Sequence, residues 1–170
     1  MTVLTREFSA RLEVRDGGDG RTLVGVAVPW GVEAQIGSYV EVFTRGAFAG
    51  AGEHPLMVTH PRDGNILPVG RSVELEDRAD GLHGAWHVSD TGLGNEVLTL
   101  VRDRVPLALS IGFVEGRNRW NATHTRVERV TAVLDHVAVV RKGAYAGAAV
   151  TALRNADPRR PRLAVARYRT

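Results

Sequence analysis

The stretch PLALSIGF at residues 106–113 is the strongest indication of the fold in this sequence. Its apolar residues recur at every second position, which predicts a β-strand with one face in the core. The opposite face carries only Ala108, Ser110 and Gly112. A hydroxyl between two such small residues leaves room for a substrate backbone to approach. The alternative is a buried serine whose hydroxyl is satisfied by a backbone carbonyl.

The composition of the whole chain agrees with a strand-rich domain. With 170 residues, of which 44% are hydrophobic, the chain is long enough for one substantial core. Its 19 glycines and 7 prolines favour many turns. The absence of cysteine excludes a disulfide framework and thiolate metal sites. No signal-peptide core and no membrane-spanning stretch is found, so we expect a soluble protein made for the cytoplasm.

The positive charge of the chain is concentrated at its C-terminal end. Residues 154–170 carry six arginines and one aspartate, a net charge of +5, so at +3 overall the remaining residues carry −2. This segment also contains two prolines and few core-forming residues. We therefore expect a globular domain at residues 1–153 and a basic, flexible tail at residues 154–170. Nucleic acid is not expected as a partner, except non-specifically through the tail.

Short alternating segments separated by turn-rich clusters predict that most elements are strands. The first two strands are expected to form a β-hairpin around the turn at residues 16–20. One amphipathic helix is expected at residues 92–102, capped by Asp90 or Thr91. Shorter helices are expected after Thr44 and over residues 144–153. The expected strands cover residues 7–14, 22–28, 38–43, 55–60, 66–75, 82–88, 104–114 and 126–140, the last as one or two strands.

Acyl transfer requires a nucleophile, a base within its reach and a group that orients the base. Ser110 can serve as the nucleophile, and His60 and His136 can serve as bases, each at a strand position. His136 is expected to share one face of its strand with Leu134. No G-x-S-x-G elbow is present, which argues against an α/β-hydrolase. Taken singly, His60 also fits a surface histidine at a strand end, and His136 a satisfied histidine inside a sheet.

The six histidines of the chain do not predict a metal site. His83 and His87 would share a strand face about 13 Å apart, which is too far for one ion. No carboxylate lies at a spacing that would complete a ligand set. We therefore expect no metal and no cofactor.

Six segments of the chain carry a resemblance to a known family: EVFTRGAF at 41–48, PLMVTH at 55–60, DGL at 80–82, LSIGF at 109–113, LDHVAVV at 134–140 and GAY at 143–145. In this order they resemble the prohead (capsid maturation) serine proteases of tailed bacteriophages. The resemblance runs from about residue 22 to about residue 149. It implies a fold like that of herpesvirus assembly proteases, an antiparallel β-barrel ringed by a few helices, and therefore a mainly β (α+β) class.

The resemblance also implies residue roles, with Ser110 as nucleophile and His60 as base. Many phage relatives carry Glu where this chain has His136, with Asp135 just before it. Herpesvirus proteases use a second histidine in a similar His-Val-Ala context, so His136 is expected to complete a Ser-His-His site. Asp135 is the alternative third member, although strand alternation places it on the opposite face.

The turn after the last strand is the expected oxyanion hole. By similarity to the herpesvirus turn, backbone N–H groups near Arg141 and Lys142 would stabilise the developing oxyanion. Gly143 replaces the proline that is usual at this point of the motif.

The function implied by the resemblance is a serine endopeptidase that cleaves capsid and scaffold proteins, and itself, during prohead maturation. Its partners would be the major capsid protein and the scaffold, and its location the assembling prohead in the host cytoplasm. A homodimer is left open. The alternative is a catalytically inactive β-barrel that binds capsid or scaffold during assembly.

Overall fold

The computed structural model describes residues 2–8, 12–15, 18–59 and 66–141. The expected helix at residues 144–153 and the tail at 154–170 lie outside these residues, so the division at residue 153 stays a prediction. The elements are β1 (Leu4–Phe8), β2 (Glu13–Val14), β3 (Thr22–Pro29), β4 (Ala34–Ile36), β5 (Tyr39–Phe43), β6 (Pro55–Met57), β7 (Gly70–Asp77), β8 (Gly81–Val88), α1 (Gly92–Arg102), β9 (Leu107–Glu115), β10 (Asn118–Trp120), β11 (Arg126–Arg129) and β12 (Ala132–Arg141).

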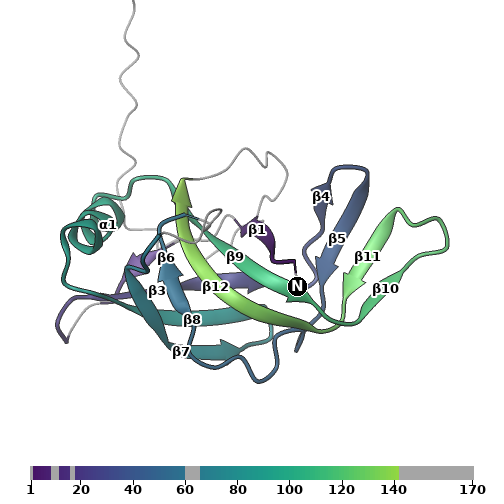
Figure 1. Ribbon diagram of the computed structural model, residues 1–170, viewed down its shortest axis with the longest axis horizontal. Helices are drawn as coiled ribbons and strands as arrows, with labels where there is room; N and C mark the ends of the chain where they lie inside the picture. Colours follow the sequence, from purple (N-terminus) through teal and green to yellow (C-terminus); the bar gives the residue numbers. More distant parts are fainter. Residues whose placement is uncertain (1, 9–11, 16–17, 60–65, 142–170) are drawn as a thin grey trace, which may run out of the picture.

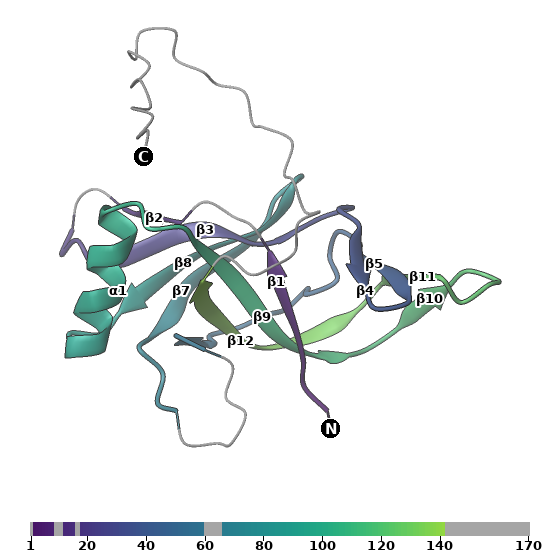
Figure 2. The same ribbon diagram turned by 90° about the horizontal axis from the view of Figure 1, so that it is seen from above.

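The strands form two sheets. The larger has the order β1-β9-β12-β6-β7-β8-β3-β2 and curls into a half-barrel, and the smaller has the order β10-β11-β5-β4 (Figure 1). Both views place α1 at one end of the molecule and the smaller sheet at the other (Figures 1 and 2).

A mainly β fold is confirmed, but the purely antiparallel barrel is wrong. β6 runs parallel to β12 in the larger sheet, and β5 runs parallel to β11 in the smaller one. A few helices were expected, whereas α1 is the only α-helix among the described residues. Alternation along a sequence predicts that a segment is a strand, but it does not say which strand lies beside it or in which direction.

The stretch at residues 106–113 forms most of β9 and behaves as its alternation predicts. Leu109, Ile111 and Phe113 have no exposed surface and belong to the main apolar core. The Phe113 ring meets Phe43 and Phe48 edge-on, at centroid distances of 5.2 and 6.2 Å. This aromatic cluster packs β9 against β5 and the turns that follow β5.

Helix α1 begins and ends where the sequence predicts. Thr91 is the N-cap, and its hydroxyl accepts a hydrogen bond from the Gly94 N–H at 3.1 Å. A Cβ on Gly94 would lie 2.3 Å from the carbonyl oxygen of Ser89, so close packing requires glycine there. The helix closes with two bonds, from Arg104 N–H to the Val101 carbonyl and from Val105 N–H to the Leu100 carbonyl, each 3.0 Å. This is a Schellman ending.

The helix expected after Thr44 is absent from the described residues, which form a run of tight turns over residues 45–50 instead. Gly46 and Gly50 have φ values of +79° and +80°. A positive φ is incompatible with a right-handed helix, so each glycine ends a turn that would otherwise continue.

The N-terminal segment does not form one strand over residues 7–14. β1 pairs with β9, whereas β2 pairs with β3 and forms the expected hairpin. The two short strands therefore lie at opposite edges of the larger sheet. These two edge strands of the half-barrel do not pair with each other.

Candidate active site

Four strands bring Ser110 into a row of side chains on the face opposite the core. Ser110 on β9 lies opposite Ala138 on β12 and Glu7 on β1, and Met57 on β6 lies beside Ala138. Residues in register on neighbouring strands point to the same face. Three strands distant in sequence therefore converge on the serine.

The Ser110 side chain is fully buried. It has no exposed surface, and its Oγ donates a hydrogen bond to the carbonyl oxygen of Arg6 at 2.9 Å. Of the two interpretations that the sequence left open, this hydrogen bond agrees with the buried serine, and the role of Ser110 as nucleophile stays a prediction.

His136 occupies the next row of the same face. It lies opposite Gly112 and is only 3% exposed. A Cβ on Gly112 would lie 2.1 Å from Cε1 and 2.4 Å from Nδ1 of the imidazole, so the ring requires glycine beneath it. The small side chains of β9 were expected to leave room for a substrate backbone, but at Gly112 this room is filled by the histidine.

A β-bulge at Asp135 sets the direction of His136. Leu134 pairs with Phe113 and His136 pairs with Gly112, so Asp135 is an extra residue between them. Because Phe113 and Gly112 point to opposite faces, Leu134 and His136 do as well. The expectation that they share a face is wrong. Bulges commonly redirect side chains in this way beside functional sites.

The two candidates for the third member of the site contact each other. Oδ2 of Asp135 lies 2.7 Å from Nδ1 of His136, and the Asp135 side chain is 47% exposed. A carboxylate only accepts hydrogen bonds, so Nδ1 of His136 carries the proton that it donates to Asp135. The strand alternation that argued against Asp135 does not apply, because the bulge interrupts it.

Three further residues are predicted to belong to the site: His60, Arg141 and Lys142. His60 and Lys142 lie outside the described residues. β6, which leads toward His60 in the chain, ends at Met57, in register with Ala138 of the Ser110 row. Arg141 lies opposite Leu107, three residues from Ser110 and about 10 Å along the strand. The roles of all these residues stay predictions.

The two histidines considered for a metal each face their own carboxylate. Nε2 of His83 lies 2.8 Å from Asp80, and Nδ1 of His87 lies 3.6 Å from Asp19. The hydrogen bond from His83 is the main cause that lowers the pKa of the Asp80 carboxyl. Within the described ranges, no group of three His, Cys, Asp or Glu residues is placed to hold a metal ion.

Among the residues that the structure describes, no helix is long and apolar enough to span a membrane.

A buried ion cluster connects the serine strand to the smaller sheet, and sequence reasoning missed it. Glu41 and Arg129 are each 1% exposed, and their side chains pair at 2.6 Å. Arg6 pairs with the other carboxylate oxygen of Glu41, and Arg129 also pairs with Glu115. Arg6 is the residue whose carbonyl accepts the Ser110 hydrogen bond. The sequence offered one signal for this cluster, which is the charged Glu41 within an apolar alternation.

The family of the chain follows from comparison with known proteins. The family described as caudovirus prohead serine protease matches residues 9–159. Since this match covers most of the chain, the chain belongs to the caudovirus prohead serine protease family, which confirms the resemblance seen in the sequence. No curated protein matches it.

A solved structure shows the same fold. The bacteriophage T4 capsid assembly protease, gp21, aligns with a TM-score of 0.60 over 83% of this chain and 98% of its own, at 11% sequence identity. At this identity the likeness concerns the fold alone.

Proposed function

We propose that this prohead serine protease cleaves capsid and scaffold proteins, and itself, with Ser110 as its nucleophile. The observation that supports this assignment is the shared face of β9 and β12, on which Ser110 and the histidine above Gly112 are neighbours. The T4 relative of the same fold is named a capsid assembly protease. The assembling prohead is accordingly the proposed place of action.

In the proposed mechanism, His60 removes the Ser110 proton as Oγ bonds to the carbonyl carbon of the scissile peptide. The same proton passes to the leaving amine as the C–N bond breaks, and water then hydrolyses the acyl-enzyme ester. The hydroxyl must first give up its hydrogen bond to the Arg6 carbonyl.

His136 acts in this proposal by orienting His60. Its Nδ1–H donates to Asp135, and in this proposal its Nε2 accepts a hydrogen bond from a ring N–H of His60. The positive charge that develops on His60 is then shared with His136 and stabilised by the Asp135 carboxylate. Asp135 and His136, first considered as alternatives, become consecutive members of one chain of hydrogen bonds.

Backbone N–H groups near Arg141 and Lys142 complete the proposed site as the oxyanion hole. A single such donor contributes about 10²- to 10³-fold to the rate in other serine proteases.

One experiment tests the proposal directly. The chain is co-expressed with the capsid protein encoded beside it, as wild type and as Ser110→Ala, and the products are measured by mass spectrometry. We expect defined capsid fragments only with the wild type. Alanine matches the small neighbours of Ser110, so the variant should fold, which circular dichroism verifies. The same fragments from Ser110→Ala would exclude Ser110 as the nucleophile.

The inactive capsid-binding barrel is the second candidate, and the complete burial of Ser110 favours it. It predicts that the wild type co-purifies with intact capsid protein and that no fragment appears. The same co-expression separates the two candidates.

The basic tail is proposed to hold the protease on an acidic surface inside the assembling shell. Deletion of residues 154–170 should leave cleavage of a short peptide unchanged, since no proposed catalytic residue lies there. It should lower the number of protease copies in immature particles, counted by quantitative mass spectrometry. Normal packaging of the shortened chain would remove this role.

A further inference from the structure

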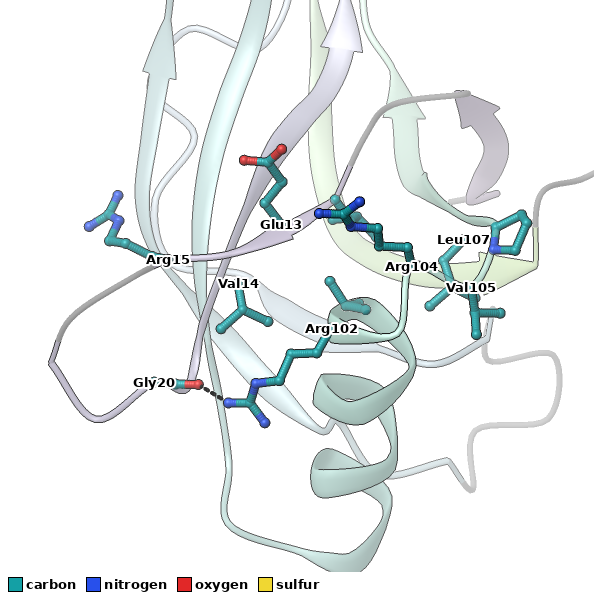
Figure 3. Close-up of a pocket in the computed structure, with 11 residues that line it drawn as sticks. Glu13, Val14, Arg15, Gly20, Arg102, Arg104, Val105 and Leu107 are labelled. Carbon is teal, nitrogen blue, oxygen red and sulfur yellow. Dashed lines mark hydrogen bonds between the residues drawn. The ribbon is translucent and has the colours of Figure 1, made fainter. Parts of the chain in front are cut away.

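A surface cavity of about 650 Å³ lies around β2 and the end of α1 (Figure 3). It is formed by residues 12–15 around β2, by Gly20, and by the end of α1 with the segment that leads into β9. Neither Ser110 nor His136 lines it, although its residue Leu107 pairs with Arg141 of the proposed oxyanion hole. The proposed mechanism uses none of the lining residues.

The walls of the cavity carry more positive than negative charge. Three arginines, Arg15, Arg102 and Arg104, face a single acidic residue, Glu13. Arg102 donates to the Gly20 carbonyl at 2.7 Å, and Arg15 lies 3.5 Å from Glu74. Among the described residues, the Arg104 guanidinium has no hydrogen-bond or ion-pair partner. Figure 3 shows it extended from the segment after α1 toward β2.

Arg104 holds this place in an unfavourable backbone conformation. Its φ is +59°, in the left-handed region that favours glycine. It stands at the position after the C-cap of α1, where a Schellman ending usually has glycine. Packing of the helix therefore does not explain an arginine at this position.

The cavity also lies at a strand edge. β2 is the last strand of the larger sheet and pairs with β3 on one side. Edges of this kind accept an extended peptide as an added strand.

We propose that this cavity binds an extended, acidic segment of another protein chain. The segment adds to the outer edge of β2, places apolar side chains against Val14 and Leu107, and directs a carboxylate to Arg104. Charge complementarity selects this ligand, because a carboxylate gives the unpaired guanidinium a partner. The chain's own C-terminal segment does not fit, since residues 154–170 carry a net charge of +5. This binding site is independent of the proposed protease activity.

Fluorescence anisotropy with a labelled decapeptide of alternating Val and Glu tests the proposal. The protein is the full chain carrying Ser110→Ala, so that the peptide is not cut. We expect the Glu peptide to bind at least about 5-fold more tightly than a matched Val-Lys peptide, and the difference to shrink in high salt. Equal binding of both peptides would overturn the proposal.

Variants of the cavity locate the binding. Arg104→Gly removes the guanidinium and suits a positive φ, so it should fold and weaken binding about 5-fold, and Arg104→Glu should weaken it further. If either variant fails to fold, Arg15→Gln is the second test. The Arg15 side chain is 53% exposed, and this substitution should also weaken binding of the peptide. The matched control is Arg119→Gln, 73% exposed on β10, which should not change the affinity.

Hydrogen exchange supplies a readout that does not depend on affinity. The bound Glu peptide should slow exchange at residues 12–15 and 104–107. Unchanged affinity in both Arg104→Gly and Arg15→Gln, or protection confined to other strands, would overturn the assignment.

Discussion

Gly112 lies directly beneath the imidazole of His136, at a place where a Cβ would come within 2.1 Å of Cε1. This contact explains the Ser-Ile-Gly spacing of β9. Ser110 and Gly112 point to the same face two residues apart, so the hydroxyl and the imidazole are diagonal neighbours across β9 and β12. Diagonal positions of a sheet are about 7–8 Å apart.

Gly112→Ala should displace His136 and impair catalysis without unfolding the protein. Overpacking at a buried site costs about 1–3 kcal/mol, which urea unfolding would measure. Peptide hydrolysis should fall by much more than the loss of folded protein explains, because the His136 ring no longer lies beside Ser110. Ala108→Gly, on the same face but away from the ring, is the matched control and should retain activity. Full activity of Gly112→Ala would show that the position of His136 is irrelevant to turnover.

The order of importance in the proposed site is His60, then His136, then Asp135. His60→Ala should lose the contribution of a positioned general base, about 10²- to 10⁴-fold in kcat. His136→Ala should lose less and retain measurable turnover, because it only orients His60. Steady-state kinetics on a peptide cut from the capsid sequence would measure both. If Asp135→Ala cripples the enzyme while His136→Ala is silent, the assignment of the third member is wrong.

Removal of the carboxylate from the buried ion cluster should destabilise the fold strongly. Glu41→Ala leaves Arg129, which is 1% exposed, without the partner at 2.6 Å, and such a loss costs about 3–5 kcal/mol. Urea unfolding would measure the change. The matched control is Glu53→Ala, in which a 74% exposed carboxylate loses its pairing with Arg71 and the cost should stay within about 0–1 kcal/mol. Equal effects of the two substitutions would contradict the structural role of the cluster.

The same substitution should have opposite effects at two positions near the end of α1. Arg104→Gly should raise the free energy of unfolding by about 0.5–1 kcal/mol, because glycine adopts the observed φ of +59° without strain. Arg102→Gly should lower it by about 1 kcal/mol, because Arg102 is helical and glycine disfavours a helix. Thermal or urea unfolding of both variants measures the pair. A loss of stability in Arg104→Gly would show that its side chain stabilises the helix ending.

Local periodicity was enough to predict the parts of this protein that depend on neighbouring residues. The alternation of residues 106–113 predicted β9, and the spacing of Leu93, Val97, Leu100 and Val101 predicted α1. For β9 this prediction holds because a strand buries one face at every second position. For α1 only Val97 and Val101 of these four are buried, Leu93 and Leu100 are exposed, and Gly94 and Leu98 complete the buried face. The ordered segments that resemble the phage proteases were likewise sufficient to indicate the family from the sequence alone.

Tertiary structure alone decided which strands meet and where each side chain points. The parallel pairing of β6 with β12 brings Met57 beside Ala138, although about eighty residues separate them in the chain. The bulge at Asp135 turns His136 onto the Ser110 face, and one extra residue of this kind has no signature in a single sequence. The pairing of Glu41 with Arg129 was equally hidden, because a buried charge is stable only beside a partner that the fold supplies. Sequence therefore determined most of the elements and indicated the family, and the long-range pairing of strands determined which side chains meet on the Ser110 face.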